Sequence, residues 1–196
     1  MKQLIKLIFL AAASVALFGC AHPINMKPNI SEIKGEVIAT IDKQVGYHIS
    51  VANMAVEVTT PGGGGDKIRY FPYRDMDAGF YKALSEVFKS VSKIANPKDA
   101  SAIDKSGITL LIVPEITTTS SSPSPFTWPP TKFTVTLNCS VLDAKGQSLT
   151  NIKVQGEGQA EFEEFKSNFS LSAVRASDDA LKKLVKALAA SKELRQ

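Results

Sequence analysis

"KFTVTLNCSVLDAKGQSLTNIKVQGEGQAEF", residues 132–162, sets the architecture of the chain. In its first half, apolar side chains occupy every second position, which is typical of a strand with one buried face. The letters DAKGQ then predict a hairpin turn, beyond which the apolar face continues. Gly156 and Gly158 share this face, so we expect a bulky element to pack over them. The apolar face consists of Phe133, Val135, Leu137, Cys139, Val141, Ile152, Val154, Ala160 and Phe162.

The run before this hairpin, ITLLIVPEI at residues 108–116, is apolar on both faces and predicts a central, buried strand. Pro114 has no amide hydrogen, so we expect strand pairing to stop or to reach a sheet edge there. Residues 117–131 are dominated by Ser, Thr and Pro, which predicts a long loop or arm between two strands.

Two amphipathic helices are predicted, one before these strands in the sequence and one after them. Asp75 or Asp77 is the predicted N-cap of the first helix, and Asn96-Pro97 is its predicted end. The second helix covers residues 168–194, with two aspartates ahead of its lysines, the order that suits the helix dipole. The apolar stripes are Phe80, Leu84, Val87, Phe88, Val91 and Ile94 in the first helix, and Leu171, Val174, Leu181, Leu184, Val185 and Leu188 in the second.

Two shorter stretches, residues 35–43 and 54–60, alternate like strands. The predicted order is therefore strand, strand, helix, strand, strand, strand, helix. Because a helix with one apolar stripe needs a sheet face to cover, we expect an α+β fold. It is a two-layer domain with a mostly antiparallel sheet of about five strands and two helices packed on it. This single domain is expected to span residues 35–196.

The composition is that of a globular protein. Hydrophobic residues make up 44% and charged residues 21% of the 196 positions. Loss of Lys2 and Lys6 with a cleaved leader lowers the formal net charge from +4 to +2. Since no basic run or aromatic-basic motif is present, nucleic-acid binding is not expected.

The chain begins MKQLIKLIFLAAASVALFGCAH, in which two lysines precede an apolar or small run from Leu7 to Gly19. This is the pattern of a secretory signal. The run is shorter than the roughly 20 residues of a bilayer-spanning helix, although a permanent anchor helix stays an alternative. The end of the run, Leu17-Phe18-Gly19-Cys20, resembles the lipobox of bacterial lipoproteins, with Phe18 bulkier than the usual occupant of its place.

The lipoprotein resemblance implies a diacylglyceryl group on the Cys20 thiol, removal of residues 1–19 as a signal peptide, and acylation of the new amine, for example with palmitate. Two or more acyl chains anchor a protein stably. Ala21 is not the aspartate that the family associates with inner-membrane retention, which implies an outer-membrane anchor facing the periplasm. Residues 20–34 are then the lipidated N-terminus and a tether. The alternative is an ordinary secreted protein in which Cys20 falls near the cleavage site.

No motif predicts catalysis, a cofactor or a metal. The Gly62–Gly65 loop fails the phosphate-binding pattern, because Asp66 stands where the last glycine belongs and Ile68 where Ser or Thr is required. A flexible connection is the simpler interpretation, and close approach by a partner's backbone is another. Histidine is too scarce for a His-rich metal site. Cys139 has no intramolecular partner once Cys20 is acylated, and it is expected to be a small buried hydrophobe.

Two aromatic segments are candidates for partner binding. The first, RYFPYR, contains Arg69, Tyr70, Phe71, Tyr73 and Arg74. The alternative is that Phe71 and one tyrosine pack under the following helix. The second segment carries Phe126 and Trp128 on a proline-rich arm, which could dock on a partner or the membrane, or fold back over the core.

The order of elements over residues 35–190 is similar to that of small periplasmic domains in outer-membrane assembly lipoproteins, of the curli-secretion and penicillin-binding-protein-activator types. This resemblance implies a non-enzymatic binding or assembly component of the cell envelope, whose partner is an envelope protein or a second copy of the chain. One alternative is a glycan- or peptidoglycan-binding module that stacks sugars on Tyr70, Tyr73 and Trp128. A second is a carboxylate-dependent hydrolase, for which Asp75/Asp77 and Glu161/Glu163/Glu164 are the nearest clusters.

Overall fold

The computed structural model describes residues 21–34, 40–61, 67–122 and 131–195. The strands are β1 (Ala21–Pro23), β2 (Ile41–Tyr47), β3 (Val58–Pro61), β4 (Lys67–Tyr70), β5 (Phe88–Lys93), β6 (Leu110–Ser121), β7 (Lys132–Asp143) and β8 (Ser148–Gln159). The helices are η1 (Ile30–Glu32), α2 (Val51–Met54), α3 (Pro72–Val87), α4 (Ala100–Lys105), α5 (Phe162–Phe165), α6 (Leu171–Ala190) and η2 (Glu193–Arg195).

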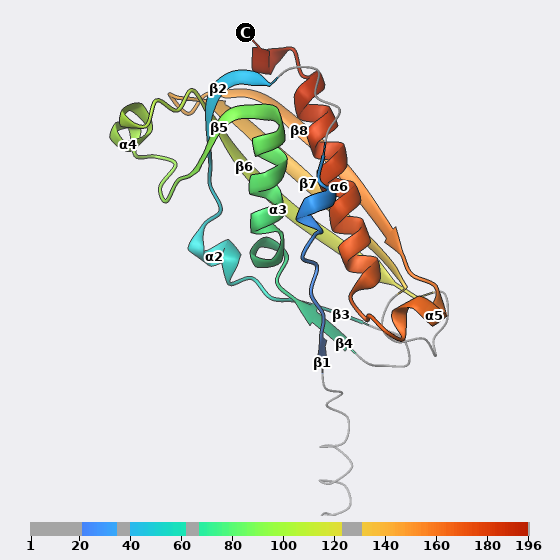
Figure 1. Ribbon diagram of the computed structural model, residues 1–196. Coiled ribbons are helices and arrows are strands. Elements are labelled where there is room, and N and C mark those ends of the chain that lie inside the picture. Colours follow the sequence, from blue (N-terminus) through green and yellow to red (C-terminus); the bar gives the residue numbers. More distant parts are fainter. Residues whose placement is uncertain (1–20, 35–39, 62–66, 123–130, 196) are drawn as a thin grey trace, which may run out of the picture.

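The main sheet has five strands in the order β5-β2-β6-β7-β8, and α3 and α6 lie across it (Figure 1). The predicted α+β class is confirmed. The sheet is more mixed than expected, because β5, β2 and β6 run parallel to one another, while β6, β7 and β8 are antiparallel. The antiparallel pairing is longer than the parallel pairing. Strand β6 pairs with β7 over its whole length, from Leu110 opposite Asp143 to Ser121 opposite Lys132.

The predicted hairpin forms β7 and β8, and its glycines are where α6 crosses the sheet. A methyl group on Gly156 would overlap backbone atoms of Ala176 and Ala180. A methyl group on Gly158 would overlap backbone atoms of Ser172 and Ala176. The missing side chains let the helix backbone approach the strand, and this confirms the expectation of a bulky element over the two glycines.

Strand β6 continues beyond Pro114, where pairing was expected to stop or to reach a sheet edge, and it includes residues 117–121 that were expected to be loop. Pairing with β7 runs through Pro114, whereas pairing with β2 ends at Ile112, so Pro114 lies at an edge on the β2 side, as the second alternative predicted. The backbone polar groups of positions 112, 114 and 116 face the side of β6 on which β2 lies, because the Ile112 carbonyl oxygen accepts a hydrogen bond from the His48 amide and the direction alternates along a strand. Since β2 has ended by this level, the missing amide of Pro114 breaks no ladder bond. The next amide on that side, Ile116, donates a 3.1 Å hydrogen bond to the Tyr73 hydroxyl.

The first long helix is shorter than predicted and is followed at once by a strand. It begins at Pro72, after Phe71 as the N-cap residue, and ends at Val87. Neither Asp75 nor Asp77 caps it, because both lie inside the helix. Residues 88–93, which continue the helical spacing in the sequence, form β5 parallel to β2. Here pairing with a sheet edge overrides the local pattern.

The predicted strands near the N-terminus are shifted. Strand β2 begins at Ile41 and ends at Tyr47, while residues 35–39 lie outside the described part of the chain. The predicted strand at residues 54–60 is only partly a strand, because Met54 ends the short helix α2 and β3 begins at Val58. Ser50 caps α2 by accepting a hydrogen bond from the Asn53 amide at 3.0 Å.

Residues 21–34, which were expected to be a tether, are packed against the domain instead. Strand β1 pairs in parallel with β4. The next ten residues, 24–33, form a segment that we call the strap, and it includes the short 3-10 helix η1. Within it Met26 and Ile33 are fully buried in the main core. This packing could not be predicted, because the buried residues of the strap follow no regular spacing.

The strap runs along α3 and α6. The Asn25 amide donates to the Ser170 hydroxyl at 3.0 Å, just before α6 begins. Further along, the Asn29 amide donates to Oδ1 of Asp178 at 2.7 Å. A methyl group on Gly79 of α3 would overlap Pro28 of the strap, so the strap and the helix backbone are in direct contact. Among the described residues, no helix is both long enough and apolar enough to cross a bilayer.

Candidate functional site

The second sheet, of order β1-β4-β3, lies at one end of the molecule, which we call the β1 pole (Figure 1). Two hydroxyl pairs join it to the end of β6. Thr60 contacts Ser120 at 2.7 Å, and Tyr70 contacts Thr118 at 2.7 Å. The chain enters the described fold at this pole, because Ala21 is the first residue of β1.

Two of the RYFPYR candidates, Arg69 and Tyr70, lie on strand β4, and they point to opposite faces of it. Ile68 and Tyr70 point inward and are fully buried, and the Tyr70 ring meets that of Phe133 edge-on at a centroid distance of 5.2 Å. Burial is the largest cause that raises the pKa of the Tyr70 hydroxyl. Lys67 and Arg69 occupy the alternate, exposed positions.

The first turn of α3 likewise separates a buried candidate, Tyr73, from an exposed one, Arg74. Tyr73 is buried, with its hydroxyl bound to the amide of Ile116. Arg74 is exposed, and its guanidinium carbon lies 3.6 Å from the centre of the Phe71 ring, in a cation–π contact. Arg69, Phe71 and Arg74 thus reach the surface, while Tyr70 and Tyr73 belong to the core.

Lys67 and Arg69 lie on β4 opposite β1, and Arg74 follows in the first turn of α3; we call these three cations the basic patch. The carboxylate contacts of the two arginines are loose. Nε of Arg69 lies 3.8 Å from Glu57, and Nε of Arg74 lies 3.9 Å from Asp75. Lys67 was missed among the sequence candidates, although its alternation with Ile68 marks it as the outer residue of a strand.

The burial of two tyrosines bears on the glycan-binding alternative. A sugar stacks on an exposed aromatic face, and neither Tyr70 nor Tyr73 presents one. Trp128, the third residue of that platform, and Phe126 lie outside the described residues, as do Cys20 and the Gly62–Gly65 loop. That loop joins the antiparallel strands β3 and β4. A phosphate-binding loop joins a strand to a helix, so this connection does not fit one.

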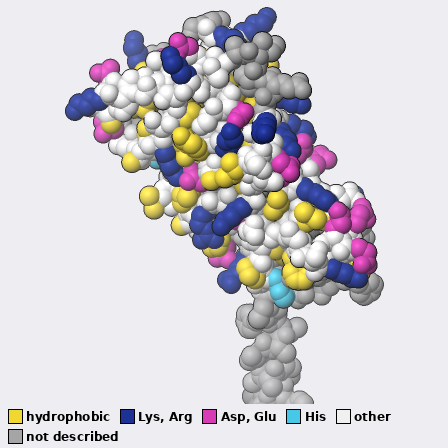
Figure 2. Space-filling model, viewed as in Figure 1, with side chains coloured by type: hydrophobic (Ala, Val, Ile, Leu, Met, Phe, Trp, Pro, Cys, Tyr) yellow, Lys and Arg dark blue, Asp and Glu magenta, His cyan; other side chains and the backbone are white. Residues whose placement is uncertain are grey.

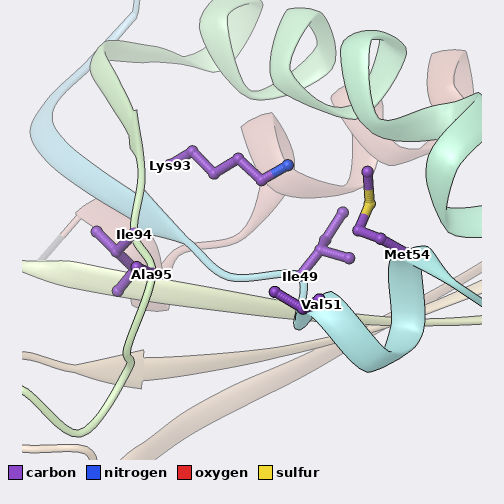
Figure 3. A pocket seen from close by; sticks show the side chains of 6 residues that line it. All are labelled: Ile49, Val51, Met54, Lys93, Ile94 and Ala95. Carbon is purple, nitrogen blue, oxygen red and sulfur yellow. The ribbon is translucent and has the colours of Figure 1, made fainter.

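An apolar hollow of about 430 Å³ lies between α2 and the end of β5 (Figure 3). Met54 and Lys93 reach over it from opposite sides, and Val51 at its edge is 88% exposed. The Lys93 amine forms a 2.7 Å ion pair with Asp77. Asp77 also accepts from the Tyr47 hydroxyl at 3.2 Å, and burial, more than this neighbouring charge, raises the pKa of Tyr47. The hollow is large enough for a small apolar group. Its lining residues are Ile49, Val51, Met54, Lys93, Ile94 and Ala95.

Cys139, the carboxylate clusters and His48, a histidine of the described fold, are engaged in structural contacts. Burial raises the pKa of the Cys139 thiol to about 12, so this cysteine is a poor nucleophile. Nδ1 of His48 lies 2.9 Å from the Ile94 carbonyl oxygen. Asp75 accepts from the Met26 amide, and Glu164 is bound by Arg175 through two hydrogen bonds. Within the described ranges, no group of three or more His, Cys, Asp or Glu side chains is arranged to hold a metal ion.

No protein-family model matches the chain, and no curated protein matches its sequence. Among solved structures, it is similar to a Xanthomonas campestris protein of the DUF330 family, at 11% identity and a TM-score of 0.48 over 88% of this chain and 91% of that one. It is also similar to the PelC dodecamer from Paraburkholderia phytofirmans, at 12% identity and a TM-score of 0.47 over 81% and 95%. A third similar chain, from Caulobacter crescentus and described as a candidate lipoprotein, has 14% identity and a TM-score of 0.34 over 67% and 85%. These scores describe a distant likeness, which assigns no function.

Proposed function

We propose that this protein is a bacterial envelope lipoprotein, anchored by lipid at Cys20 in the outer membrane and facing the periplasm, and that it acts by binding rather than by catalysis. The observation that carries the proposal is the position of β1. The strand begins at Ala21, directly after the cysteine of the lipobox. A signal peptide that ends at Gly19 would thus leave the folded domain complete from its first strand, with the acylated residue at its edge.

The anchor is tested by mass spectrometry of the mature protein from membranes and by the Cys20→Ser variant. We expect an N-terminal peptide that starts at Cys20 and carries the mass of a diacylglyceryl group and a further acyl chain. The variant should keep its leader and lose lipid labelling. A mature N-terminus without lipid, or unchanged processing and membrane fractionation of Cys20→Ser, would contradict the proposal.

The binding role is supported by the state of the reactive groups. The buried Cys139 thiol and the occupied His48 and Asp75 side chains act as structural residues in the described fold. An anchored domain of this kind contributes to an envelope assembly through contact with another protein or with further copies of itself. Fold likeness alone does not choose between these two partners.

Crosslinking in living cells tests the binding role. A lysine-reactive reagent that enters the periplasm should give discrete adducts, and mass spectrometry of each adduct identifies a second copy of the chain or another envelope protein. The control is Cys20→Ser. Because this variant should keep its leader and not reach the outer membrane, it should lose the adducts. If intact cells give no discrete adduct at any reagent concentration, the binding role is wrong.

A further inference from the structure

We propose that the basic patch of Lys67, Arg69 and Arg74 binds the phosphate groups of the membrane that holds the lipid anchor, so that the β1 pole lies flat on an anionic phospholipid surface. The inference rests on the proposed lipid anchor at Cys20 and specifies the orientation of the domain. Its partner is the phospholipid headgroup, not a protein.

The register of the second sheet places the patch beside the anchor. Ala21 of β1 lies opposite Lys67 of β4, and Pro23 lies opposite Arg69. Neighbouring strands are about 4.8 Å apart, and consecutive Cα atoms are about 3.8 Å apart. The backbone of Lys67 therefore lies next to that of Ala21, the residue that follows Cys20 in the sequence. Since the strap is built into the core, no free segment separates the patch from the bilayer.

The side chains of the patch are directed outward. Lys67 and Arg69 alternate with the buried Ile68 and Tyr70, so their side chains leave the face of the sheet that turns away from the core. Figure 2 shows dark-blue Lys and Arg side chains near the bottom of the folded part, beside the point where the chain enters it. A long cationic side chain there can reach the headgroup layer while its stem lies against the protein.

The charge of the patch is only partly compensated. The two carboxylate contacts, of Arg69 with Glu57 and of Arg74 with Asp75, are longer than a hydrogen bond. Both guanidinium groups thus keep donors for phosphate oxygens, which Arg binds with two parallel hydrogen bonds. The glutamates of the nearby helix α5 are paired within their own region, Glu163 with Lys166 and Glu164 with Arg175.

A fluorescent reporter on the lipidated mature protein tests the orientation. Thr59 is exposed and lies opposite Arg69 in the second sheet, so Thr59→Cys places a reporter at the patch. The buried Cys139 does not compete for the label. The protein is inserted into vesicles of phosphatidylethanolamine and phosphatidylglycerol in a ratio of about three to one, and is labelled there with a polarity-sensitive dye.

We expect the dye at position 59 to emit at shorter wavelength than in detergent and to be quenched by spin-labelled lipid. Lys67→Glu/Arg69→Glu should reduce the quenched fraction at least about tenfold, and phosphatidylcholine vesicles or high salt should act in the same direction. The matched control is Lys98→Glu/Lys105→Glu, which reverses two exposed lysines near α4 and should change nothing. A dye at Lys145→Cys, in the turn at the other end of the β7–β8 hairpin, should stay in water.

The failure of the two proposals can be told apart. If the protein does not stay with the vesicles at all, the lipid anchor is wrong. If it stays with them but the dye at position 59 remains in water, or responds equally to both pairs of charge reversals, the anchor holds and the basic patch does not bind the membrane.

Discussion

The backbone amide of Met26 donates a 3.2 Å hydrogen bond to Oδ2 of Asp75, which joins residues 49 positions apart. Met26 is fully buried, and Asp75 is only 5% exposed. One bond thus links the strap that follows the lipobox to the first turns of α3, whose N-terminus carries Phe71 and Arg74. We call this hydrogen bond between the Asp75 carboxylate and the Met26 amide the clasp, because it holds the strap to the helix that carries Arg74 of the basic patch.

Loss of this clasp should destabilise the domain. Asp75→Ala leaves the buried Met26 amide without an acceptor, so we expect the free energy of unfolding to fall by about 1–3 kcal/mol. Asp75→Asn keeps an acceptor oxygen and should lose less. Urea unfolding measures both, with Asp42→Ala, an 81% exposed carboxylate paired with Lys89, as the control. Equal effects of Asp75→Ala and Asp42→Ala would show that the clasp contributes nothing.

The strap itself offers a matched pair of substitutions. Met26→Ala removes a fully buried side chain and should cost about 2–5 kcal/mol of unfolding free energy. Ile30→Ala, in the same segment but 45% exposed, should cost about 0.5 kcal/mol or less. Thermal or urea unfolding of the mature protein distinguishes them. If residues 21–34 were a tether, both substitutions would be silent.

The close approach of α6 to β8 predicts an unusual sensitivity at a glycine. Gly156→Ala places a methyl group on backbone atoms of Ala176 and Ala180, which a rotamer change cannot relieve, so we expect a loss of about 3 kcal/mol or more. Gly146→Ala, in the β7–β8 turn at φ 80°, meets no neighbouring atom and should cost only the backbone strain of about 1–2 kcal/mol. A smaller effect at Gly156 than at Gly146 would contradict this packing of helix on strand.

These packing relationships could be predicted where apolar residues recur at the regular spacing of a strand or a helix. Gly156 and Gly158 fall on the apolar face of a strand, and α6 carries an uninterrupted stripe, so both elements were found. Strand β5 was missed because Val91 and Ile94 continue the helical spacing of α3. Val91 is extended because it pairs with the edge of β2, and the Ile94 amide, just beyond β5, donates to the Tyr47 carbonyl oxygen of β2. The strap was missed because it is ordered by contacts with α3 and α6, which the sequence of the strap does not record.

The RYFPYR segment likewise contains residues whose exposure was predicted from the sequence and residues whose burial was not. Arg69, Phe71 and Arg74 were identified from residue type alone. The two arginines are exposed, and Phe71 is half-buried beneath the Arg74 guanidinium. Tyr70 was misjudged, although its spacing from Ile68 indicates a shared buried face. Tyr73 could not be assigned, because its burial depends on the amide of Ile116 on a strand 43 residues away in sequence.

The pair of Glu164 with Arg175 predicts a pH dependence of stability. The two hydrogen bonds from Arg175 are the largest cause that lowers the pKa of Glu164 from 4.5 to about 2. Because the folded-state pKa lies below that of the unfolded chain, the stabilisation is complete above pH 4.5 and is lost as the pH falls toward 2. The effect should be small, since the pair is exposed to solvent.

Urea midpoints recorded between pH 6 and pH 2 test this dependence. We expect Glu164→Gln to lose stability relative to the wild type at neutral pH, with the difference disappearing toward pH 2. Glu163→Gln removes a neighbouring carboxylate that is 80% exposed and serves as the control for charge. A constant difference between Glu164→Gln and the wild type across the whole range would contradict the assignment.

Hydrogen exchange of the strap in the lipidated, membrane-bound protein is the decisive measurement, because it reports whether the domain is folded up to its anchor. The amides of Ile24, Met26 and Asn29 donate to Arg69, Asp75 and Asp178, respectively, so they should exchange as slowly as amides in the middle of α3. Such protection means that residues 24–29 stay folded against the domain in the membrane-bound protein, as the fixed orientation of the β1 pole requires. Exchange of all three amides at the rate of an unstructured peptide would mean that the domain moves on a loose tether, and that neither the packed strap nor the fixed orientation of the β1 pole exists.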